Sequence, residues 1–282
     1  MKAIAQRKVV RFKSGVAEAE ADDLVAVEEP LEIRAADEVL AITMRTPGND
    51  RELAVGFLFA EGVIGSSDDI GAVFHCGRVG TPEHGNAINL APGGGVSLDI
   101  DRVSATRRGT LTTSACGVCG RTSIDDVVER CVRLRPGAPV KASVVSAAME
   151  KLRKLQPTFD RTGGLHAAAA LSGNGEVLAA FEDVGRHNAV DKVVGALVLA
   201  GKIARGRAQS GPDAPALLVV SGRASFEIIQ KAAAAGLHVV ASVSAPSSLA
   251  VDLSAATGVT LAGFVRNGAL TVYANPAGII EG

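Results

Sequence analysis

The most constraining feature of the sequence is the regular alternation of strand-like and helix-like segments between residues 165 and 273. Short runs rich in β-branched residues are typical of buried strands, whereas apolar residues spaced three and four apart indicate helices. Such alternation predicts an α/β fold, in which right-handed crossovers build a largely parallel sheet covered by helices on both faces. The elements expected are a β-hairpin formed by residues 165–171 and 176–181, a helix over 188–199, a strand over 216–220, a helix ending near 235, a strand over 237–243, a further helix, and a closing pair of strands within 260–273.

The sequence before residue 105 has a different pattern, in which glycine-rich loops separate short strand-like segments. A helix is predicted to begin at Asn49 or Asp50 and to end near Gly62, because Asn and Asp favour helix starts and Gly favours helix ends. This part is therefore predicted to be a smaller α+β domain. Its strands are expected at 8–12, at 24–34 with Pro30 separating two pieces, and at 39–44, 72–75, 87–90 and 96–100.

The chain of 282 residues is long enough for two domains. We predict an N-terminal α+β domain over residues 1–105, a mobile connecting loop over 106–122, and a larger C-terminal three-layer α/β/α domain over 123–282. Two helices are expected early in the larger domain. One begins near residue 123 and carries Cys131 and Leu134 on its apolar face, and the other covers 143–155.

Composition excludes several classes of function. The sequence has 29 basic and 30 acidic residues, so its net charge does not favour binding to nucleic acid or to an anionic membrane. It has no tryptophan and one tyrosine, which leaves no aromatic surface for stacking on bases. The first 15 residues lack the apolar core of a secretory signal, and no apolar run is long enough to cross a bilayer. We predict a cytoplasmic protein without nucleic-acid or membrane partners.

Cys116 and Cys119 lie three positions apart in the glycine-containing segment 112–120. Such a pair can cycle between dithiol and disulfide, carry a sulfane sulfur, or supply half of a zinc site. Nearby cations and a helix start favour the reactive thiolate form. Arg107, Arg108 and Arg121 flank the pair, so its chemistry is expected to be that of reactive thiols.

A zinc site is less favoured by the sequence. Structural zinc usually takes four ligands, and the chain has no second Cys-x-x-Cys pair. Cys76, next to His75, is a further candidate donor, whereas Cys131 is expected to pack in the core. A zinc deaminase is not supported, because Ala115 replaces the proline of that signature and no histidine is followed two residues later by glutamate. We expect no metal of the protein's own, and a dithiol redox or zinc module stays an alternative.

Polar residues gather where strands of the predicted sheet lead into helices. Residues 182–192 contain five charged side chains and a histidine, 221–223 read Ser-Gly-Arg, and 244–248 are rich in serine. Open α/β sheets bind ligands at this edge, and a hydroxyl, a glycine backbone and a guanidinium at a helix start suit a phosphate. The pattern predicts an elongated anionic ligand such as a nucleotide or pterin derivative. Helix capping and ordinary ion pairs are the alternative explanation for the individual side chains.

An ordered set of segments closely resembles the formate dehydrogenase accessory sulfurtransferase family, FdhD. The segments are residues 44–48, 56–62, the Cys116/Cys119 pair, 182–192, 221–223 and 263–266. The resemblance implies a protein that accepts sulfur from a cysteine desulfurase. It also implies transfer of that sulfur to the molybdenum cofactor, in its bis-molybdopterin guanine dinucleotide form, that is destined for formate dehydrogenase.

The resemblance also implies roles for particular residues. Cys116 would carry the persulfide, Cys119 would be its partner, and residues 264–269 would contact the cofactor, which a guanine nucleotide can mimic. The family resemblance further implies a homodimer and, for the larger domain, a fold similar to that of cytidine deaminases without their zinc ligands. A non-catalytic chaperone that carries the cofactor is the alternative. The predicted cofactor-binding residues are Phe264, Val265, Arg266, Asn267, Gly268, Ala269, Ser221, Gly222, Arg223, Arg186 and His187.

Overall fold

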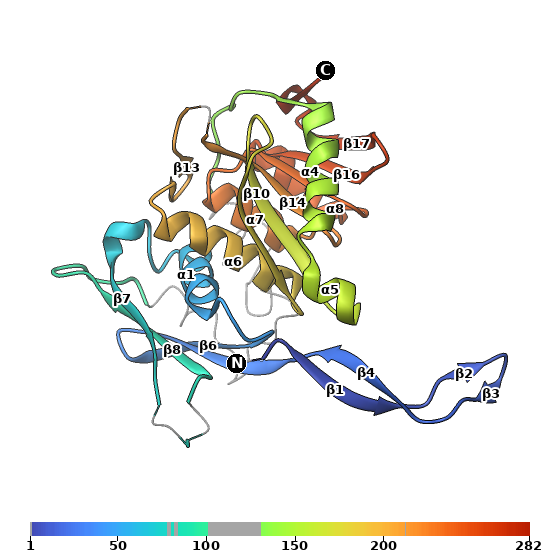
Figure 1. Cartoon of the computed structure of the whole chain (residues 1–282). Coiled ribbons are helices and arrows are strands. Elements are labelled where there is room, and N and C mark those ends of the chain that lie inside the picture. Colours follow the sequence, from blue (N-terminus) through green and yellow to red (C-terminus); the bar gives the residue numbers. More distant parts are fainter. Residues whose placement is uncertain (1, 78–79, 82–83, 101–130, 212) are drawn as a thin grey trace.

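The computed structural model describes residues 2–77, 80–81, 84–100, 131–211 and 213–282. Its centre is a six-stranded sheet with the strand order β11-β10-β14-β15-β16-β17 (Figure 1). The elements predicted between residues 165 and 273 are confirmed, with small shifts at their ends. The strands are β10 (His166–Ser172), β11 (Val177–Asp183), β14 (Pro215–Val220), β15 (Val239–Ser242), β16 (Thr260–Arg266) and β17 (Ala269–Ala274).

The central sheet is mixed, so the prediction of a largely parallel sheet is wrong. The pairs β14–β15 and β15–β16 are parallel, whereas β10–β11, β10–β14 and β16–β17 are antiparallel. Both ends of the sheet are hairpins, whose turns follow Ser172 and Arg266. A parallel connection needs about a dozen residues or more, so turns this short force an antiparallel pairing.

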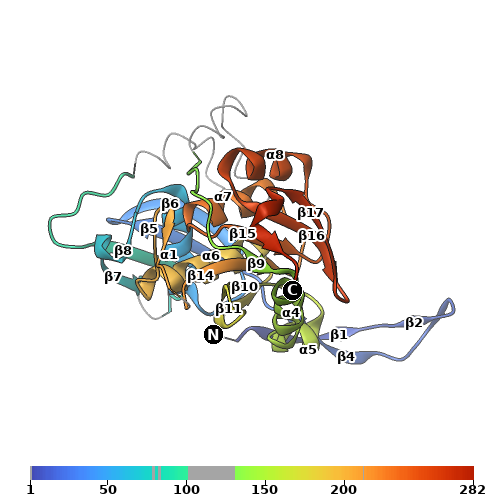
Figure 2. The ribbon, with the colours of Figure 1, turned by 90° about the horizontal axis from the view of Figure 1, so that it is seen from above.

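Helices cover both faces of the central sheet, as Figure 2 shows. Alternate residues of β10 face opposite sides: Ala167 and Ala169 pack in a cluster with α4, whereas Ala168 and Ala170 pack in a cluster with α6. The three-layer α/β/α arrangement is therefore confirmed. The helices are α4 (Ala142–Lys154) on one face, followed by α5 (Pro157–Thr162), and α6 (Arg186–Leu199), α7 (Phe226–Ala234) and α8 (Ser248–Thr257) on the other.

The N-terminal part contains a second, four-stranded sheet with the order β6-β5-β8-β7. Helix α1 (Asp50–Glu61) follows β6, with Asn49 and Gly62 at its two ends, as predicted. The strands are β5 (Glu29–Ala35), β6 (Glu38–Arg45), β7 (Ile70–His75) and β8 (Ala87–Pro92). The short elements are η1 (Ser67–Asp69), the pair β12 (Ile203–Ala204) and β13 (Arg207–Ala208), the pair β9 (Val140–Lys141) and β18 (Ile279–Ile280), and η2 (Pro276–Gly278).

Two local predictions for this part are wrong. Pro30 lies inside β5 opposite Met44, at the end of the strand where β8 does not reach, so its missing N–H interrupts no pairing with β8. Residues 96–100 form a loop and not a strand. Leu98 and Ile100 pack against the core from this loop. Burial alone therefore accounts for their apolar character.

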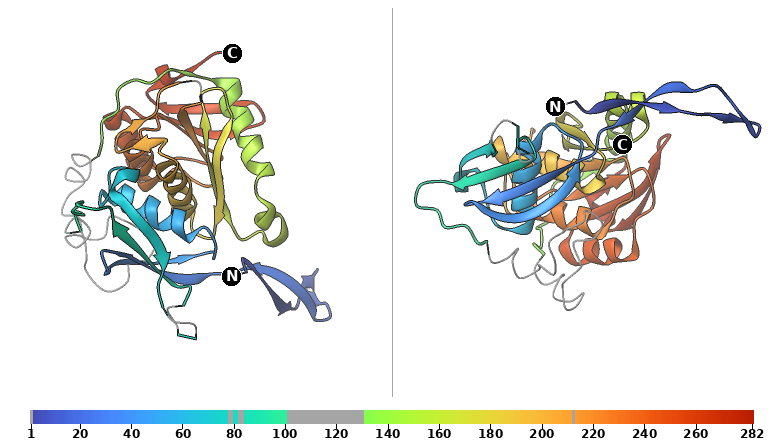
Figure 3. Two further views of the ribbon diagram at one scale, coloured as in Figure 1. Left: turned by 60° about the vertical axis from the view of Figure 1, so that its left-hand side comes forward. Right: turned by 90° about the horizontal axis from the view of Figure 1, so that it is seen from below.

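A β-hairpin arm at the N-terminus projects from the body of the protein (Figure 3). Two side chains near its tip are strongly exposed, Phe12 at 71% and Val16 at 69%. The predicted strand at 8–12 corresponds to parts of two strands separated by a break. The arm consists of β1 (Ile4–Val9) paired with β4 (Ala21–Ala26), and β2 (Phe12–Lys13) paired with β3 (Val16–Ala17).

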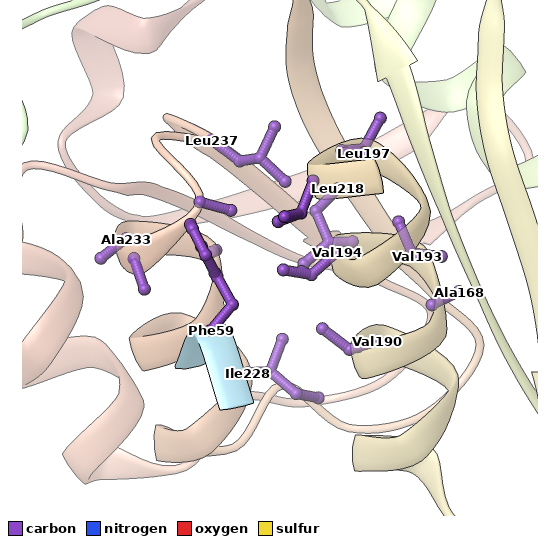
Figure 4. Packing of buried hydrophobic residues seen from close by; sticks show 14 of the residues in the cluster. Phe59, Ala168, Val190, Val193, Val194, Leu197, Leu218, Ile228, Ala233 and Leu237 are labelled. Atoms are coloured by element: carbon purple, nitrogen blue, oxygen red, sulfur yellow. The ribbon is translucent and has the colours of Figure 1, made fainter. Parts of the chain in front are cut away.

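Helix α1 packs directly against the larger α/β part. Phe59 is fully buried and lies among side chains of α6 and α7, including Val190 and Ile228 (Figure 4). Two glycines, Gly56 and Gly195, allow α1 and α6 to approach this closely. A Cβ on Gly56 would overlap the backbone carbonyl of Asp191 in α6, and a Cβ on Gly195 would overlap that of Glu52 in α1. A single hydrophobic cluster therefore runs from the N-terminal sheet to α7. The boundary predicted between residues 105 and 123 stays a prediction.

The helix predicted from residue 123 lies mostly outside the described residues. Its described end is not helical, because residues 131–139 run as an irregular segment. The Leu134 N–H donates a hydrogen bond to the Thr257 carbonyl at 2.8 Å, and Cys131 and Leu134 pack against the core. The expected burial of Cys131 is thus confirmed without the helix. Within the described ranges, no helix has the length and apolar character needed to cross a membrane.

Candidate functional site

The candidate site lies at one edge of the central sheet, where three helices begin. Helices α6, α7 and α8 start directly after the ends of β11, β14 and β15. The loops before α7 and α8 touch, since the Ser247 N–H donates to the Ala224 carbonyl at 3.0 Å. Helix N-termini carry partial positive charge and unpaired N–H groups. The edge therefore offers a favourable environment for an anionic ligand.

A buried ionic network fixes the first turn of α6. Asp183 is fully buried, and its carboxylate lies 2.7 Å from the Lys192 ammonium. It also accepts hydrogen bonds from the Gly185 N–H at 2.8 Å and from the Asn188 side chain at 3.0 Å. The Thr46 N–H donates to the same carboxylate at 3.2 Å. This network attaches the loop after β6 to the beginning of α6, so the N-terminal sheet forms part of the site's support.

A second buried pair stabilises the loop itself. The Arg45 guanidinium binds both oxygens of Asp50 at 3.0 Å and donates to the Gly85 carbonyl at 3.0 Å. Arg45 has no exposed side-chain surface. Because breaking such a buried pair leaves an uncompensated charge, Arg45 and Asp50 hold the start of α1 rather than meeting a ligand.

Arg186, His166 and Gly222 lie close together at this edge of the central sheet. A Cβ on Gly222 would lie 3.4 Å from His166 Nδ1 and 4.0 Å from Arg186 Cδ, so the three residues are close neighbours. Burial lowers the pKa of His166, and the positive charges of Arg186 and His187 lower it further. The Nε atom of Arg186 is buried and has no hydrogen-bond partner among the described residues. A buried guanidinium nitrogen without a partner is costly, and an anionic ligand would satisfy it.

Ser221 and Arg223 frame the same glycine but differ in their surroundings. The Ser221 hydroxyl accepts a hydrogen bond from the Ala167 N–H at 2.8 Å, which ties the loop after β14 to β10. Arg223 is exposed. The structure thus brings Arg186 and Gly222 together, with Ser221 engaged in holding the loop.

His187, predicted to bind the cofactor, is buried and hydrogen-bonded on both ring nitrogens. Its Nε2 lies 2.9 Å from the Ser225 hydroxyl, and its Nδ1 lies 2.6 Å from the Glu227 carboxylate. The ring cannot donate to a phosphate without breaking one of these contacts. The sequence reasoning missed Ser225 and Glu227. The available signal was their position in the first turn of the predicted helix after Ser221-Gly222-Arg223.

A further ion pair lies deeper between α6 and α7. The Lys231 ammonium is 2.6 Å from the Asp191 carboxylate, and both groups are buried. Burial raises the pKa of Asp191 to about 6, against the opposing effect of Lys231. Burial alone would lower the pKa of Lys231, but the carboxylates of Asp191 and Glu61 raise it.

The segment from Phe264 to Ala269, predicted to contact the cofactor, is divided by the structure. Phe264 is 41% exposed with φ +52°, and its N–H donates to the Ser244 carbonyl at 3.3 Å, beside the loop that precedes α8. Val265 is buried in the cluster with α4, so its side chain faces the core. Asn267 and Gly268 have φ +51° and +78° and form the tight turn of the β16–β17 hairpin, with Arg266 and Ala269 paired on either side. Phe264 and Arg266 are the exposed side chains of β16 in this segment.

Cys116 and Cys119 lie outside the described residues. Two cysteines lie among the described residues, Cys76 and Cys131, and both are partly buried. Among the described residues, no group of three or more His, Cys, Asp or Glu side chains is arranged to hold a metal ion.

Comparison with known proteins places these features in a family. The FdhD/NarQ family model matches residues 26–280. A protein of Anaeromyxobacter dehalogenans named sulfur carrier protein FdhD is 56% identical over 273 residues, covering 97% of this chain and 92% of the relative. A protein of Streptomyces avermitilis with the same name is 45% identical over 275 residues, covering 95% of this chain and 93% of the relative.

A solved structure agrees with the fold. The crystal structure of a Desulfotalea psychrophila protein, described provisionally as a formate dehydrogenase accessory protein, superposes with a TM-score of 0.74. The two chains are 23% identical, and the match covers 99% of this chain and 100% of the other. At this identity the likeness establishes the fold alone. The family model and the sequence relatives, in contrast, span nearly the whole chain, and on that ground the chain belongs to the FdhD/NarQ family.

Proposed function

We propose that this protein is a sulfurtransferase in the maturation of formate dehydrogenase. It accepts sulfur from a cysteine desulfurase as a persulfide on Cys116 and passes it to the bis-molybdopterin guanine dinucleotide form of the molybdenum cofactor. The observation that carries this proposal is the combination of the Cys116/Cys119 pair in the sequence with relatives named sulfur carrier proteins. The persulfide forms when the Cys116 thiolate attacks the terminal sulfur of the donor's persulfide and releases the donor's thiolate.

The sheet edge is the proposed binding site for the cofactor, which is the substrate of the transfer. Arg186 Nε, which has no hydrogen-bond partner among the described residues, and the three helix N-termini suit phosphate groups. Phe264 offers an exposed ring beside the loop before α8. The guanine nucleotide portion of the cofactor would occupy this edge, so a guanine nucleotide alone should bind there. We further propose that the protein acts in the cytoplasm as a homodimer.

The proposal is tested by sulfur loading. Wild-type protein incubated with a cysteine desulfurase and cysteine should gain about 32 Da per sulfur atom by mass spectrometry. Cys116→Ala should abolish this gain and leave formate dehydrogenase inactive in cells. Cys76→Ala is the matched control, since Cys76 is a partly buried cysteine far from the Cys116/Cys119 pair in sequence, and it should load normally.

Two results would decide for the alternatives. Full formate dehydrogenase activity with Cys116→Ala would refute sulfur transfer and favour a chaperone that only carries the cofactor. Zinc bound in a one-to-one ratio and released on thiol modification would favour a zinc module. A guanine nucleotide should bind in either carrier model, so the mass measurement is the decisive one.

A further inference from the structure

The hydroxyl of Ser225, the capping residue just before α7, makes an unusual hydrogen bond for that position. Serine at a helix start normally accepts a hydrogen bond from the second or third N–H of its own helix. Ser247 does this at the start of α8, where its hydroxyl accepts from the Ala250 N–H at 3.2 Å. Ser225 at the start of α7 makes no such bond, and its hydroxyl lies instead 2.9 Å from His187 Nε2.

His187 connects this hydroxyl to a carboxylate. The Glu227 carboxylate, 2.6 Å from Nδ1, can only accept a hydrogen bond when ionised, so the Nδ1 atom carries the proton. Nε2 is then the nitrogen that gains or loses a proton, and it faces Ser225. Carboxylate, imidazole and hydroxyl thus form one hydrogen-bonded chain, in the order that activates a hydroxyl or imidazole for proton transfer.

The three hydrogen-bonded residues are largely shielded from solvent. The side chains of His187 and Glu227 are 8% and 15% exposed, and Ser225 is partly buried. His187 directly follows Arg186, and Ser225 lies three residues after Gly222, whose Cβ position is 4.0 Å from Arg186 Cδ. A proton moving along the hydrogen bonds from His187 to Ser225 would therefore be delivered near the proposed phosphate site.

The charged groups around His187 come from each neighbouring element. Arg186 and Asp191 lie on α6 itself, and His166 on β10 is close enough for Arg186 and His187 to lower its pKa. On α7, Glu227 contacts the ring, and Lys231 pairs with Asp191. Glu61 at the end of α1 acts on both members of that pair, and Asp183 at the end of β11 acts on His166.

The proposed sulfur transfer consumes a proton. In the transfer, the Cys119 thiolate would attack the persulfide R–S–SH of Cys116 to give a disulfide and HS⁻, so that the two thiols supply the two electrons that reduce the sulfane sulfur. Exchange of an oxo ligand for sulfide is then Mo=O + HS⁻ + H⁺ → Mo=S + H₂O, with no change in the oxidation state of molybdenum. One external proton is consumed for each oxygen released as water.

We propose that Ser225, His187 and Glu227 form a proton relay that delivers this proton to the departing oxygen. This inference rests on the proposed function. In the relay, protonated His187 donates from Nε2 to the Ser225 hydroxyl, which passes its own proton to the oxygen. Glu227 orients the ring and stabilises its protonated form. His187 then recovers a proton from solvent. His187 and Glu227 are positioning residues, and Ser225 is the group that meets the substrate.

The experiment separates loading, binding and transfer. Wild type, Ser225→Ala and Glu227→Gln are loaded with sulfur, titrated with GDP, and then mixed with the cofactor, and cyanide-labile sulfur on molybdenum is followed over time. Loading and GDP affinity should stay within about twofold of wild type. Transfer should slow by about 100-fold or more, in the range seen for lost general acid catalysis. Glu227→Gln should also move the pH profile of transfer. Wild-type transfer rates with an unmoved profile would overturn the relay.

Two controls make the result specific. Ser66→Ala removes a true helix cap from η1, which lies outside the sheet edge, so it should lower stability by about 1 kcal/mol and leave transfer unchanged. Nitrogen-15 NMR of the His187 ring is independent of sulfur transfer: neutral His187 should carry its proton on Nδ1, the nitrogen that faces Glu227. A neutral ring that carries its proton on Nε2 overturns the relay even if wild-type protein transfers no sulfur. Absence of transfer by wild type, with normal loading, counts against the proposed function instead.

Discussion

Replacing Gly56 by alanine should destabilise the protein, although alanine is the better helix former. In an exposed helix interior the substitution would stabilise by about 1 kcal/mol. At Gly56 the new Cβ would overlap the Asp191 carbonyl, and at Gly195 it would overlap the Glu52 carbonyl, so α1 and α6 cross at two glycines. Because both obstacles are backbone atoms, no side-chain rotation can relieve the overlap.

The expected magnitude follows from these opposing effects. Overpacking a core usually costs about 1–3 kcal/mol, and a rigid backbone obstacle places Gly56→Ala at or beyond the upper limit. After the gain in helix propensity, the net loss should be about 2 kcal/mol. At roughly 2–4 °C per kcal/mol, the melting temperature should fall by about 4–8 °C. The Gly56→Ala/Gly195→Ala double variant should lose more.

Thermal unfolding followed by circular dichroism measures the effect, with guanidinium denaturation as a second measurement. Gly94→Ala is the matched control, because no atom lies within 4 Å of a Cβ placed there, and its melting temperature should equal that of wild type. A Gly56→Ala protein that melts at or above the wild-type temperature would refute the close crossing of α1 and α6.

Two further predictions concern the site. Arg186→Gln should weaken GDP binding by about 10- to 100-fold in calorimetry, because it removes a charged donor, while Arg153→Gln on α4 should leave the affinity unchanged. Burial raises the pKa of Asp191 from 3.8 to about 6, so between these pH values the folded protein keeps a proton that the unfolded chain releases. The free energy of unfolding of the wild type should therefore decline as the pH rises from 3.8 to about 6 and level off above it. The uncharged double variant Asp191→Asn/Lys231→Met should lack this decline in urea denaturation, and parallel curves for the two proteins would contradict the raised pKa.

Local signals predicted the elements well because their causes are local. Asn49 and Gly62 mark the ends of α1, and the Asn267-Gly268 turn accounts for the hairpin of β16 and β17. Strand neighbours were harder, since β10 pairs antiparallel with β14 across the intervening β11 and α6. Nothing in the sequence of either strand specifies that direction. The prediction of a largely parallel sheet failed for this reason.

The site was only partly predictable from the sequence. The cluster of charges at 182–192 indicated a functional edge, and Arg186 does carry a buried nitrogen without a partner among the described residues. Which charges pair with one another depends on long-range packing. His187 looked like a ligand from its position, but its partners Ser225 and Glu227 come from another helix, 38 residues further along the chain in the case of Ser225. Only the crossing of α6 and α7 brings them together.

The N-terminal part of the chain has a direct bearing on the site, although it contributes no side chain to the relay. Asp183 holds Lys192 and Asn188 of α6, and it receives the Thr46 N–H from the loop after β6. The Lys192 ammonium in turn donates to the Thr46 carbonyl at 3.1 Å. Since Arg186 begins the same helix, the N-terminal loop helps to fix where its guanidinium and the neighbouring imidazole lie. The segment at 44–48 therefore acts on the site by positioning α6, which gives a physical reason for its place among the residues that resemble the family.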